Sequence, residues 1–450
     1  MKSMLVVKGF PLYTQIWSDQ PPFFTYALAL MFKIIGFEVN AGRVFVLFLS
    51  SILLGSAFLF LQRVWSNWHA IAGAILIILL PHYLRLSVSN MVGLPALAFA
   101  LLSLSTLVIW HQQRNQIWLV LSAFVLSLSL LTKIFTGLLI PIFLIGLLIG
   151  EYKQKDSPKG WISRLSPILI WCGVLVGSTL SLAIMFVGPK NLTQLVMPHL
   201  VASNSRMTDI IFDSMPIEWH LQGSLLILSL GIIGVIIAII KRSWLSFYLI
   251  SWMGVSYLLL TNYSPVWYHH QLIITIPAAM LGGIAVGEVA YATFGIKRHY
   301  ELPTYVKLLL ISGALIFLVA LITRFQAIIY EYNQKSSQRF VESGTLSVDE
   351  RILKRMSTHA NETNWVFTDL PIYPFRVGLK VPPELGVISA KRILTGTLTE
   401  EKILSILQER QPEQILLGRF EYPSMDEYIE RNYKLLFSME GKRLFLRNDL

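Results

Sequence analysis

Long apolar runs leave this chain few ways to fold. A helix that crosses the hydrocarbon core of a bilayer needs roughly 17 to 25 mainly apolar residues. About ten such runs follow one another along the chain, at residues 43–62, 69–86, 92–110, 116–132, 134–150, 166–187, 221–240, 244–261, 268–290 and 304–323. They predict a mainly α, polytopic membrane bundle. A shorter apolar run, residues 23–36, is predicted to form an interfacial or re-entrant helix.

The composition agrees with a membrane protein. Hydrophobic residues make up 54% of the 450 residues and charged residues 14%, and the mean hydropathy is +0.60. The formal charge of +11 does not indicate nucleic-acid binding, because most Lys and Arg residues lie in short loops between apolar runs. The single cysteine, Cys172, excludes a disulfide framework or a cysteine zinc site within one chain.

The positive charges also predict an orientation, since cytoplasmic loops of membrane proteins carry an excess of Lys and Arg. If residues 1–42 lie outside, the inner loops hold ten basic residues and the outer loops three. The inner residues are Arg63, Arg114, Lys153, Lys155, Lys159, Arg164, Lys241, Arg242, Lys297 and Arg298, and the outer ones are Lys133, Lys190 and Arg206. We therefore expect a multi-pass protein of the plasma (inner) membrane with an extracytoplasmic C-terminus.

A region of different composition follows the apolar runs. From about residue 324, amphipathic helices alternate with short strand-like runs. Ser347 and Glu350 form a capping box, and Thr399 precedes a second helix. The predicted organisation is an external loop with an interfacial helix at 1–42, a membrane bundle at 43–323 and a small extracytoplasmic α/β domain at 324–450.

The loop before the first long run carries an acid followed by two prolines, in Asp19-Gln20-Pro21-Pro22. The prolines stiffen the backbone and prevent a helix at this point. A carboxylate held in this way at a membrane surface could bind a metal, orient a sugar hydroxyl or act as a general base. An ordinary solvated loop acid fits the same local sequence.

Other polar residues stand near the ends of apolar runs. Lys133 could hold a lipid phosphate as a compact point charge, or simply extend its ammonium group to the interface. His269 and His270 follow Tyr268 where a helix is expected to begin. Adjacent residues on a helix point about 100° apart, so these histidines are expected to contact substrate or form interfacial hydrogen bonds rather than share a metal.

The outer loop at residues 188–220 is rich in titratable groups. It contains His199, Asp209, Asp213, Glu218 and His220. A polar chamber for a substrate and an ordinary hydrated loop both fit this density.

Several short segments stand in a characteristic order: Asp19-Gln20-Pro21-Pro22, Gly36, Arg43, Leu131-Thr132-Lys133 and Trp267-Tyr268-His269-His270. In this order they resemble the GT-C glycosyltransferases, specifically family 39 and the protein-mannosyltransferase-like group that includes the aminoarabinose transferase of lipid A. Thr368-Asp369-Leu370-Pro371 and Val381-Pro382-Pro383-Glu384-Leu385 are similar to the soluble outer domain of bacterial members. The similarity extends over nearly the whole chain.

The resemblance implies transfer of a sugar from a polyprenyl-phosphate carrier to a lipid, glycan or protein acceptor at the outer membrane face. Asp19 is then the catalytic residue, and the substrate-binding residues are Gln20, Lys133, Tyr268, His269 and His270. The family's mechanism inverts the sugar and does not require metal, so a divalent cation is admitted as a cofactor without being needed. Membrane lipids are expected partners, and nucleic acid is not.

Two other interpretations stay open. A transporter or flippase of lipid-linked saccharides would have internal repeats and charged or broken helices near the midplane, whereas this sequence has no evident repeat and its ionisable residues lie at helix ends. The second open interpretation is an inactive protein of the same fold. The resemblance also calls for one more crossing and an outer-loop acid ahead of Asp19. We therefore expect the frame upstream of Met1 to encode roughly 40 to 70 further residues with a crossing of about 20 apolar residues.

Overall fold

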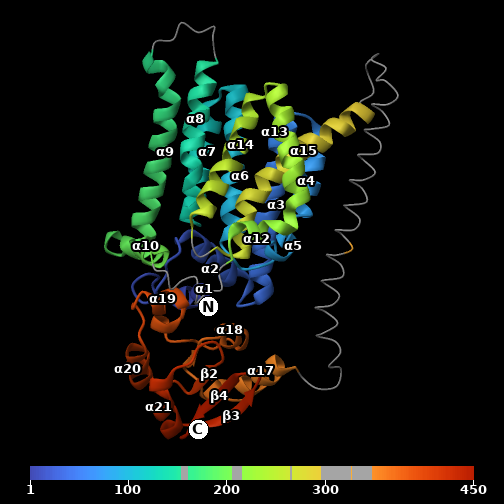
Figure 1. Cartoon of the computed structure of the whole chain (residues 1–450). Coiled ribbons are helices and arrows are strands. Elements are labelled where there is room, and N and C mark those ends of the chain that lie inside the picture. The colour runs from blue at the N-terminus through green and yellow to red at the C-terminus, as the bar shows by residue number, and fades with distance from the viewer. Residues whose placement is uncertain (154–160, 205–214, 264–265, 295–325, 327–346) are drawn as a thin grey trace. The chain divides into compact units, whose positions relative to one another are not determined.

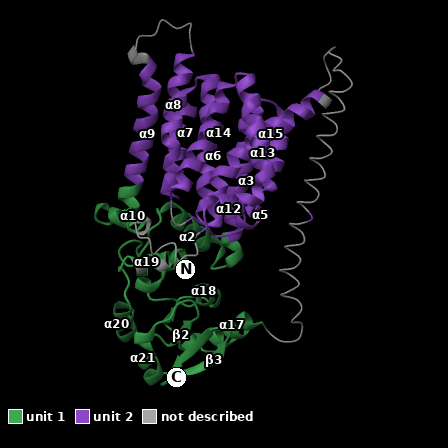
Figure 2. Ribbon diagram, in the orientation of Figure 1, with its two compact units in different colours: residues 1–42, 183–207, 331–450 green, residues 43–182, 208–330 purple. Residues whose placement is uncertain are grey.

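The computed structural model describes residues 1–153, 161–204, 215–263, 266–294, 326 and 347–450 (Figure 1). The chain divides into two compact units, which Figure 2 colours separately. Unit 1 comprises residues 1–42, 183–207 and 331–450, and unit 2 comprises residues 43–182 and 208–330.

Unit 2 is a bundle of helices. Its long elements are α3 (Val39–Val64), α4 (Asn67–Ile78), α6 (Gly93–Gln113), α7 (Gln116–Leu130), α8 (Leu139–Tyr152), α9 (Trp161–Val187), α13 (Leu225–Ile240), α14 (Phe247–Thr261) and α15 (Leu272–Phe294). The first residues of α3, 39–42, and the last residues of α9, 183–187, belong to unit 1. Short elements connect them: α5 (Tyr83–Leu86), η1 (Ile134–Leu138), α12 (Ile217–Leu221), η3 (Gln222–Ser224), η4 (Trp244–Ser246) and η5 (Tyr268–Gln271).

The described part of the chain contains seven helical stretches that are long and apolar enough to cross a membrane: Val39–Val64, Gly93–Gln113, Ile134–Tyr152, Arg164–Val187, Ile217–Ile240, Trp244–Thr261 and Tyr268–Ala292. The prediction of a mainly α, polytopic membrane protein with a small C-terminal α/β region is confirmed. The seven stretches account for seven of the apolar runs in the sequence. The run at 304–323 lies outside the described residues.

The other two runs form shorter helices than expected. The run at 69–86 is divided into α4 and α5, because Pro81 has no N–H to continue a helix and His82 takes the left-handed conformation, with φ of 64°. The run at 116–132 forms α7, which ends at Leu130 after 15 residues. At 1.5 Å per residue such a helix is about 22 Å long, less than the roughly 30 Å of a hydrocarbon core.

Small residues let helices of unit 2 approach closely. On α13, a Cβ added at Gly234 would lie 1.9 Å from the carbonyl oxygen of Leu281 on α15. A Cβ added at Gly283 of α15 would lie 2.5 Å from the Cα of Gly73 on α4. Close packing at glycines is a common means of helix association in membranes, where helices gain little from burying apolar side chains.

Unit 1 contains α1 (Lys2–Val7), α2 (Phe23–Ile35), η2 (Pro189–Leu195), α10 (Met197–Asn204) and a C-terminal α/β region. The helices of that region are α17 (Val348–Thr358), η6 (Ala360–Glu362), α18 (Ile372–Val377), η7 (Pro383–Leu385), α19 (Ala390–Leu394), α20 (Glu400–Arg410), η8 (Pro423–Met425) and α21 (Asp426–Asn432). Its strands are β1 (Val366–Thr368), β2 (Gln414–Leu417), β3 (Tyr433–Met439) and β4 (Lys442–Arg447), in the sheet order β1-β2-β4-β3. β1 and β2 are parallel and the other pairs antiparallel.

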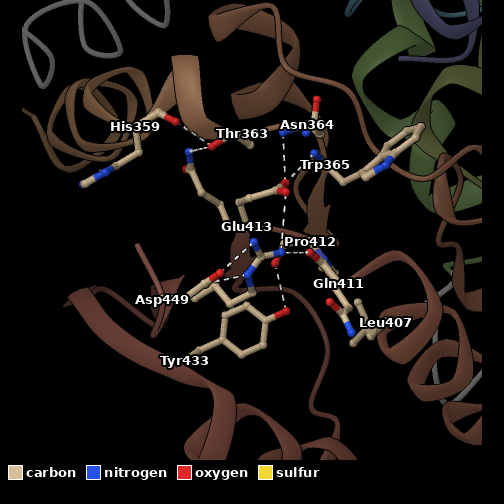
Figure 3. A network of polar contacts seen from close by, with 12 residues as sticks. His359, Thr363, Asn364, Trp365, Leu407, Gln411, Pro412, Glu413, Tyr433 and Asp449 are labelled. Carbon is tan, nitrogen blue, oxygen red and sulfur yellow. Dashed lines mark hydrogen bonds and ion pairs between the residues drawn. The ribbon is translucent and has the colours of Figure 1, made fainter.

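A network of polar contacts connects β4, the last strand of the chain, to the segment before β1 (Figure 3). Glu413 Oε2 accepts hydrogen bonds of 2.9 Å from the backbone N–H groups of Asn364 and Trp365. Glu413 Oε1 lies 3.5 Å from Arg447 Nη1, and Arg447 Nε donates to Asp449 Oδ1 at 2.7 Å. The network therefore has a structural role and holds the C-terminal strand in register.

One hydrophobic core of unit 1 combines all three of its chain segments. Leu5, Leu12, Tyr13 and Ile16 from the first segment pack with Val187 and Leu195 from the second and with Val381 from the third. The N-terminal loop is therefore held by residues that are remote in sequence.

Candidate functional site

The loop from Gly9 to Pro22 has a fixed conformation that depends on Tyr13. Tyr13 is buried and has a φ of 73°, which a residue with a side chain rarely adopts. Its N–H donates to the carbonyl of Ile16 at 2.7 Å, and its hydroxyl donates to the carbonyl of Gln20 at 2.7 Å. Such a conformation persists only where several contacts impose it, so the loop is a built structure rather than a loose connection.

Ser18 fixes the backbone next to Asp19. Its side chain is fully buried, and its hydroxyl accepts a hydrogen bond from Lys2 Nζ at 3.1 Å. The same hydroxyl lies 3.1 Å from the carbonyl of Gln20, to which it donates. Together with the Tyr13 hydroxyl, these contacts hold the residues on both sides of Asp19.

The carboxylate of Asp19 lies among basic groups of unit 1. Lys391 Nζ, from α19, donates to Asp19 Oδ2 at 3.2 Å. His199 Nε2, from α10, lies 3.8 Å from the same oxygen. The Asp19 side chain is only 16% exposed, so these groups replace much of the water that would otherwise solvate the charge.

His199 links the other two residues. Its Nδ1 lies 3.1 Å from Lys391 Nζ, and its Nε2 lies 3.1 Å from the backbone carbonyl of Asp19. An ammonium group can only donate, so we assign Nδ1 as the acceptor and Nε2–H as the donor to the carbonyl.

The surroundings determine the charge of Asp19. Burial by itself would raise the pKa of this carboxyl, but Lys391, Lys2 and His199 together outweigh burial and hold its pKa below the ordinary value. Burial lowers the pKa of the Lys2 ammonium, and the Asp19 charge opposes that shift. Asp19 is therefore a carboxylate at neutral pH.

Arg392, next to Lys391, anchors α19. Its side chain is buried and donates through Nη1 to the carbonyls of Glu384 and Val387, at 2.6 and 2.9 Å. Its guanidinium lies 5.2 Å from the centre of the Trp17 ring. Burial lowers the pKa of Arg392 to about 10, so it stays charged at neutral pH.

A second set of predicted residues lies in unit 2. A Cβ added at Gly93, the first residue of α6, would lie 3.8 Å from Lys133 Nζ and 3.8 Å from His269 Cδ2. Lys133 and His269 therefore meet beside the start of α6. Lys133 is held after the end of α7, where its N–H donates to the carbonyl of Ser129 at 2.9 Å.

Aromatic contacts hold the residues of η5. The ring of His270 stacks on Phe135 with centroids 5.8 Å apart, and its Nδ1 accepts from the backbone N–H of Trp267 at 3.3 Å. The guanidinium of Arg85 lies 5.4 Å from the centre of the Tyr268 ring. Nδ1 of His270 therefore caps the turn at the start of η5.

Lys133 and His269 lie beside Gly93, and His220 is close enough to His269 to interact with it electrostatically. Nδ1 of His269 and Nε2 of His220 are buried and make no hydrogen bond in the part of the chain that the structure describes. With the ammonium of Lys133, these groups could surround an anion such as a phosphate.

The described residues do not fit a divalent cation. Among them, no group of three or more His, Cys, Asp or Glu side chains is placed to hold a metal ion. At Asp19 the neighbours are the ammonium groups of Lys391 and Lys2 and the imidazole of His199. The two ammonium groups repel a cation, so the surroundings of Asp19 do not favour a divalent metal ion.

The structure thus brings Asp19 into a cluster that the sequence described only in part. Lys2 and Lys391 were not predicted, and His199 was predicted only as one of several polar residues of an outer loop. Gln20 contributes its carbonyl to the loop. Of the other loop acids, Asp209 and Asp213 lie outside the described residues, and Glu218 accepts a hydrogen bond from the Tyr257 hydroxyl at 3.3 Å.

Residues 19–176 match the family described as dolichyl-phosphate-mannose-protein mannosyltransferase. The crystal structure of ArnT from Cupriavidus metallidurans bound to undecaprenyl phosphate matches with a TM-score of 0.59 and 12% identity, over 98% of this chain and 91% of that chain. The archaeal oligosaccharyltransferase AglB from Archaeoglobus fulgidus, in complex with an inhibitory peptide and a dolichol-phosphate, matches with a TM-score of 0.55 and 11% identity, over 99% of this chain and 70% of that chain. No curated protein matches. At these identities the two structures show the fold.

Proposed function

We propose that this chain, which has the fold of the GT-C glycosyltransferases and matches the protein-mannosyltransferase family over residues 19–176, transfers a sugar from a polyprenyl-phosphate carrier to an acceptor at the outer face of the membrane. The observation that carries the proposal is Asp19, an ionised carboxylate on a fixed loop at the start of the matched region. The ArnT structure holds undecaprenyl phosphate and the AglB structure a dolichol-phosphate. Both are carriers of the proposed class.

Asp19 orients the acceptor in this proposal. A general base is most effective when its pKa lies near the working pH, whereas Lys391, Lys2 and His199 hold the pKa of Asp19 below its ordinary value. Its main role is therefore to accept a hydrogen bond from the acceptor's O–H or N–H and aim the nucleophile. It takes the proton late, when bonding to the sugar has made that proton strongly acidic.

The bond changes define what the other residues do. A bond forms between the nucleophile and the anomeric carbon, and the bond from that carbon to the phosphate oxygen breaks. The polyprenyl phosphate leaves with the electron pair, and the new negative charge needs donors. Lys133 and His269 are the groups that we assign to it, because preorganised donors stabilise charge that develops in the transition state. Gln20, Tyr268 and His270 are assigned to the binding and positioning of substrate.

The proposal is tested with the purified chain in lipid nanodiscs and a panel of radiolabelled polyprenyl-phosphate sugars. Asp19→Asn keeps the shape of the side chain but removes its charge, and should lower the rate of transfer by about a hundredfold or more. Asp426→Asn, at an exposed acid on α21, is the matched control and should transfer at the wild-type rate. Equal rates for wild type and Asp19→Asn would exclude the proposed role of Asp19. If the wild type transfers no sugar from any donor, the proposed glycosyltransferase activity is contradicted.

A further inference from the structure

Asp19 is held through only one of its two carboxylate oxygens. Oδ2 takes the hydrogen bond from Lys391 and is the oxygen nearest to His199 Nε2. Oδ1 makes no hydrogen bond or ion pair with any residue that the structure describes. The side chain is 16% exposed, so this second oxygen is open to a partner from outside the chain.

The contacts around Oδ2 form a closed ring of three residues. Lys391 Nζ donates to Asp19 Oδ2 at 3.2 Å and to His199 Nδ1 at 3.1 Å. His199 Nε2 then donates to the main-chain carbonyl of Asp19 at 3.1 Å. Because the ring includes both the side chain and the main chain of Asp19, it restricts rotation of the carboxylate about its side-chain bonds.

The two partners are themselves held in place. Ser389 caps α19 by accepting the N–H of Arg392 at 3.2 Å, and the buried Arg392 fixes the same helix through the carbonyls of Glu384 and Val387. Lys391 therefore projects from an anchored turn. A group that is anchored in this way can set the direction of another side chain, as the partners of a catalytic residue must.

We propose that Lys391 and His199 are positioning residues that hold Asp19 by Oδ2 and present Oδ1 to the acceptor. The inference rests on the proposed function, since it gives each oxygen of Asp19 its own task. Neither residue contacts the sugar in this scheme. They act through Asp19.

The identity of Lys391 matters as well as its charge. A lysine ammonium is a single point charge, whereas the guanidinium of arginine binds a carboxylate with two parallel hydrogen bonds. An arginine at this position would take both oxygens of Asp19 and compete with the acceptor. Lys391→Arg should therefore transfer sugar more slowly than the wild type, although it keeps the positive charge.

The pH profile distinguishes positioning from a merely structural role. The titratable groups that face Asp19 are Lys2 on α1, Lys391 on α19, His199 on α10 and Tyr13 in the loop. Lys391 is the largest of the influences that keep the pKa of Asp19 low, so Lys391→Ala raises that pKa. Asp19 is then protonated at a higher pH, and the acid limb of kcat/KM moves to higher pH.

The first measurement does not depend on activity. A water-soluble carbodiimide joins a carboxylate and an amine that are in contact as an amide, and takes up the released water to become a urea. Treating the full chain in nanodiscs should link Asp19 to Lys391, as identified by mass spectrometry of the digested protein. The link should be absent in Lys391→Ala and in Asp19→Asn. A link from Asp19 to Lys2 in its place would overturn the arrangement.

The second measurement is kinetic. Lys391→Ala should lower kcat/KM about tenfold to a hundredfold, the effect expected for a lost charged hydrogen bond, and should shift the acid limb as described. Lys402→Ala, an exposed lysine on α20, is the matched control and should change neither. If the link forms but Lys391→Ala keeps the wild-type kcat/KM and pH profile, the positioning role is excluded. If the wild type transfers no sugar, the proposed function fails, while the link still decides whether Lys391 holds Asp19.

Discussion

The surroundings of Lys133 bear on the two interpretations that its local sequence leaves open. Its ammonium lies beside Gly93 and near His269 rather than at a bare helix end, which favours phosphate binding over simple exposure to the interface. Lys133→Ala should raise the apparent KM for the lipid-linked donor about tenfold to a hundredfold, because a charged hydrogen bond contributes about 1.5 to 3 kcal/mol. Donor titration measures this. Lys190→Ala, at an exposed lysine of η2, should leave the KM unchanged.

Substitutions at Gly93 test whether the donor binds between Lys133 and His269. A methyl group there would be in ordinary van der Waals contact with Lys133 Nζ and His269 Cδ2, at 3.8 Å from each. Gly93→Ala should therefore keep nearly normal donor binding, whereas Gly93→Leu should fill the space between the two side chains and raise the donor KM. Titration of both variants with the same donor checks this. Equal KM values for the two would show that nothing binds beside this glycine.

At the scale of single residues, the sequence could nominate Asp19, Lys133 and the histidines of η5, because each has a distinctive local setting. It could not nominate Lys391. That lysine is 372 residues from Asp19 and precedes Arg392 in a turn with no pattern of its own. Only packing between remote segments gives it a role.

Helices α13 and α15 depend on glycine where they meet. A Cβ at Gly234 would approach the carbonyl oxygen and the carbonyl carbon of Leu281 to 1.9 and 2.5 Å, and backbone atoms cannot rotate away as a side chain can. Gly234→Ala should destabilise the chain by about 1 to 3 kcal/mol, the usual cost of overpacking a close-packed contact. Thermal unfolding in detergent measures the change. Gly254→Ala on α14 is the control: among the described residues, none lies within 4 Å of the added atom, so this variant should unfold at the same temperature as the wild type.

Local rules predicted the ends of helices better than hydropathy predicted their number. The capping box of Ser347 and Glu350 is confirmed, with both of its hydrogen bonds present, and Thr399 caps α20 as expected. These caps depend only on neighbours three residues apart. Hydropathy instead averages over a window, so it ran through the break at Pro81 and past the end of α7.

At the scale of the whole molecule, the resemblance to GT-C glycosyltransferases is confirmed by the family match and by the fold. The sequence also predicted the small α/β region at the C-terminus. It could not predict that residues 1–42, 183–207 and 331–450 form one compact unit. That association depends on buried contacts among three separate segments, and periodicity within a segment carries no information about them.

The orientation of the chain is testable with fusions. Because the inner loops carry most of the Lys and Arg residues, the C-terminus is expected outside. A reporter that is active only outside the cytoplasm should be active after Leu450 and inactive when inserted after Arg242. The opposite pattern would invert the orientation and place Asp19 on the cytoplasmic side.

The closed ring at Asp19 imposes an order on biosynthesis. Lys2, Ser18 and Asp19 are synthesised before His199, and His199 is synthesised 192 residues before Lys391. Until Lys391 is made and folded into α19, the carboxylate of Asp19 lacks its closest cation. A chain that stalls in its last quarter could insert its helices and still have an unfinished site. The ring around Asp19 can therefore close only after the segment that carries Lys391 has been synthesised.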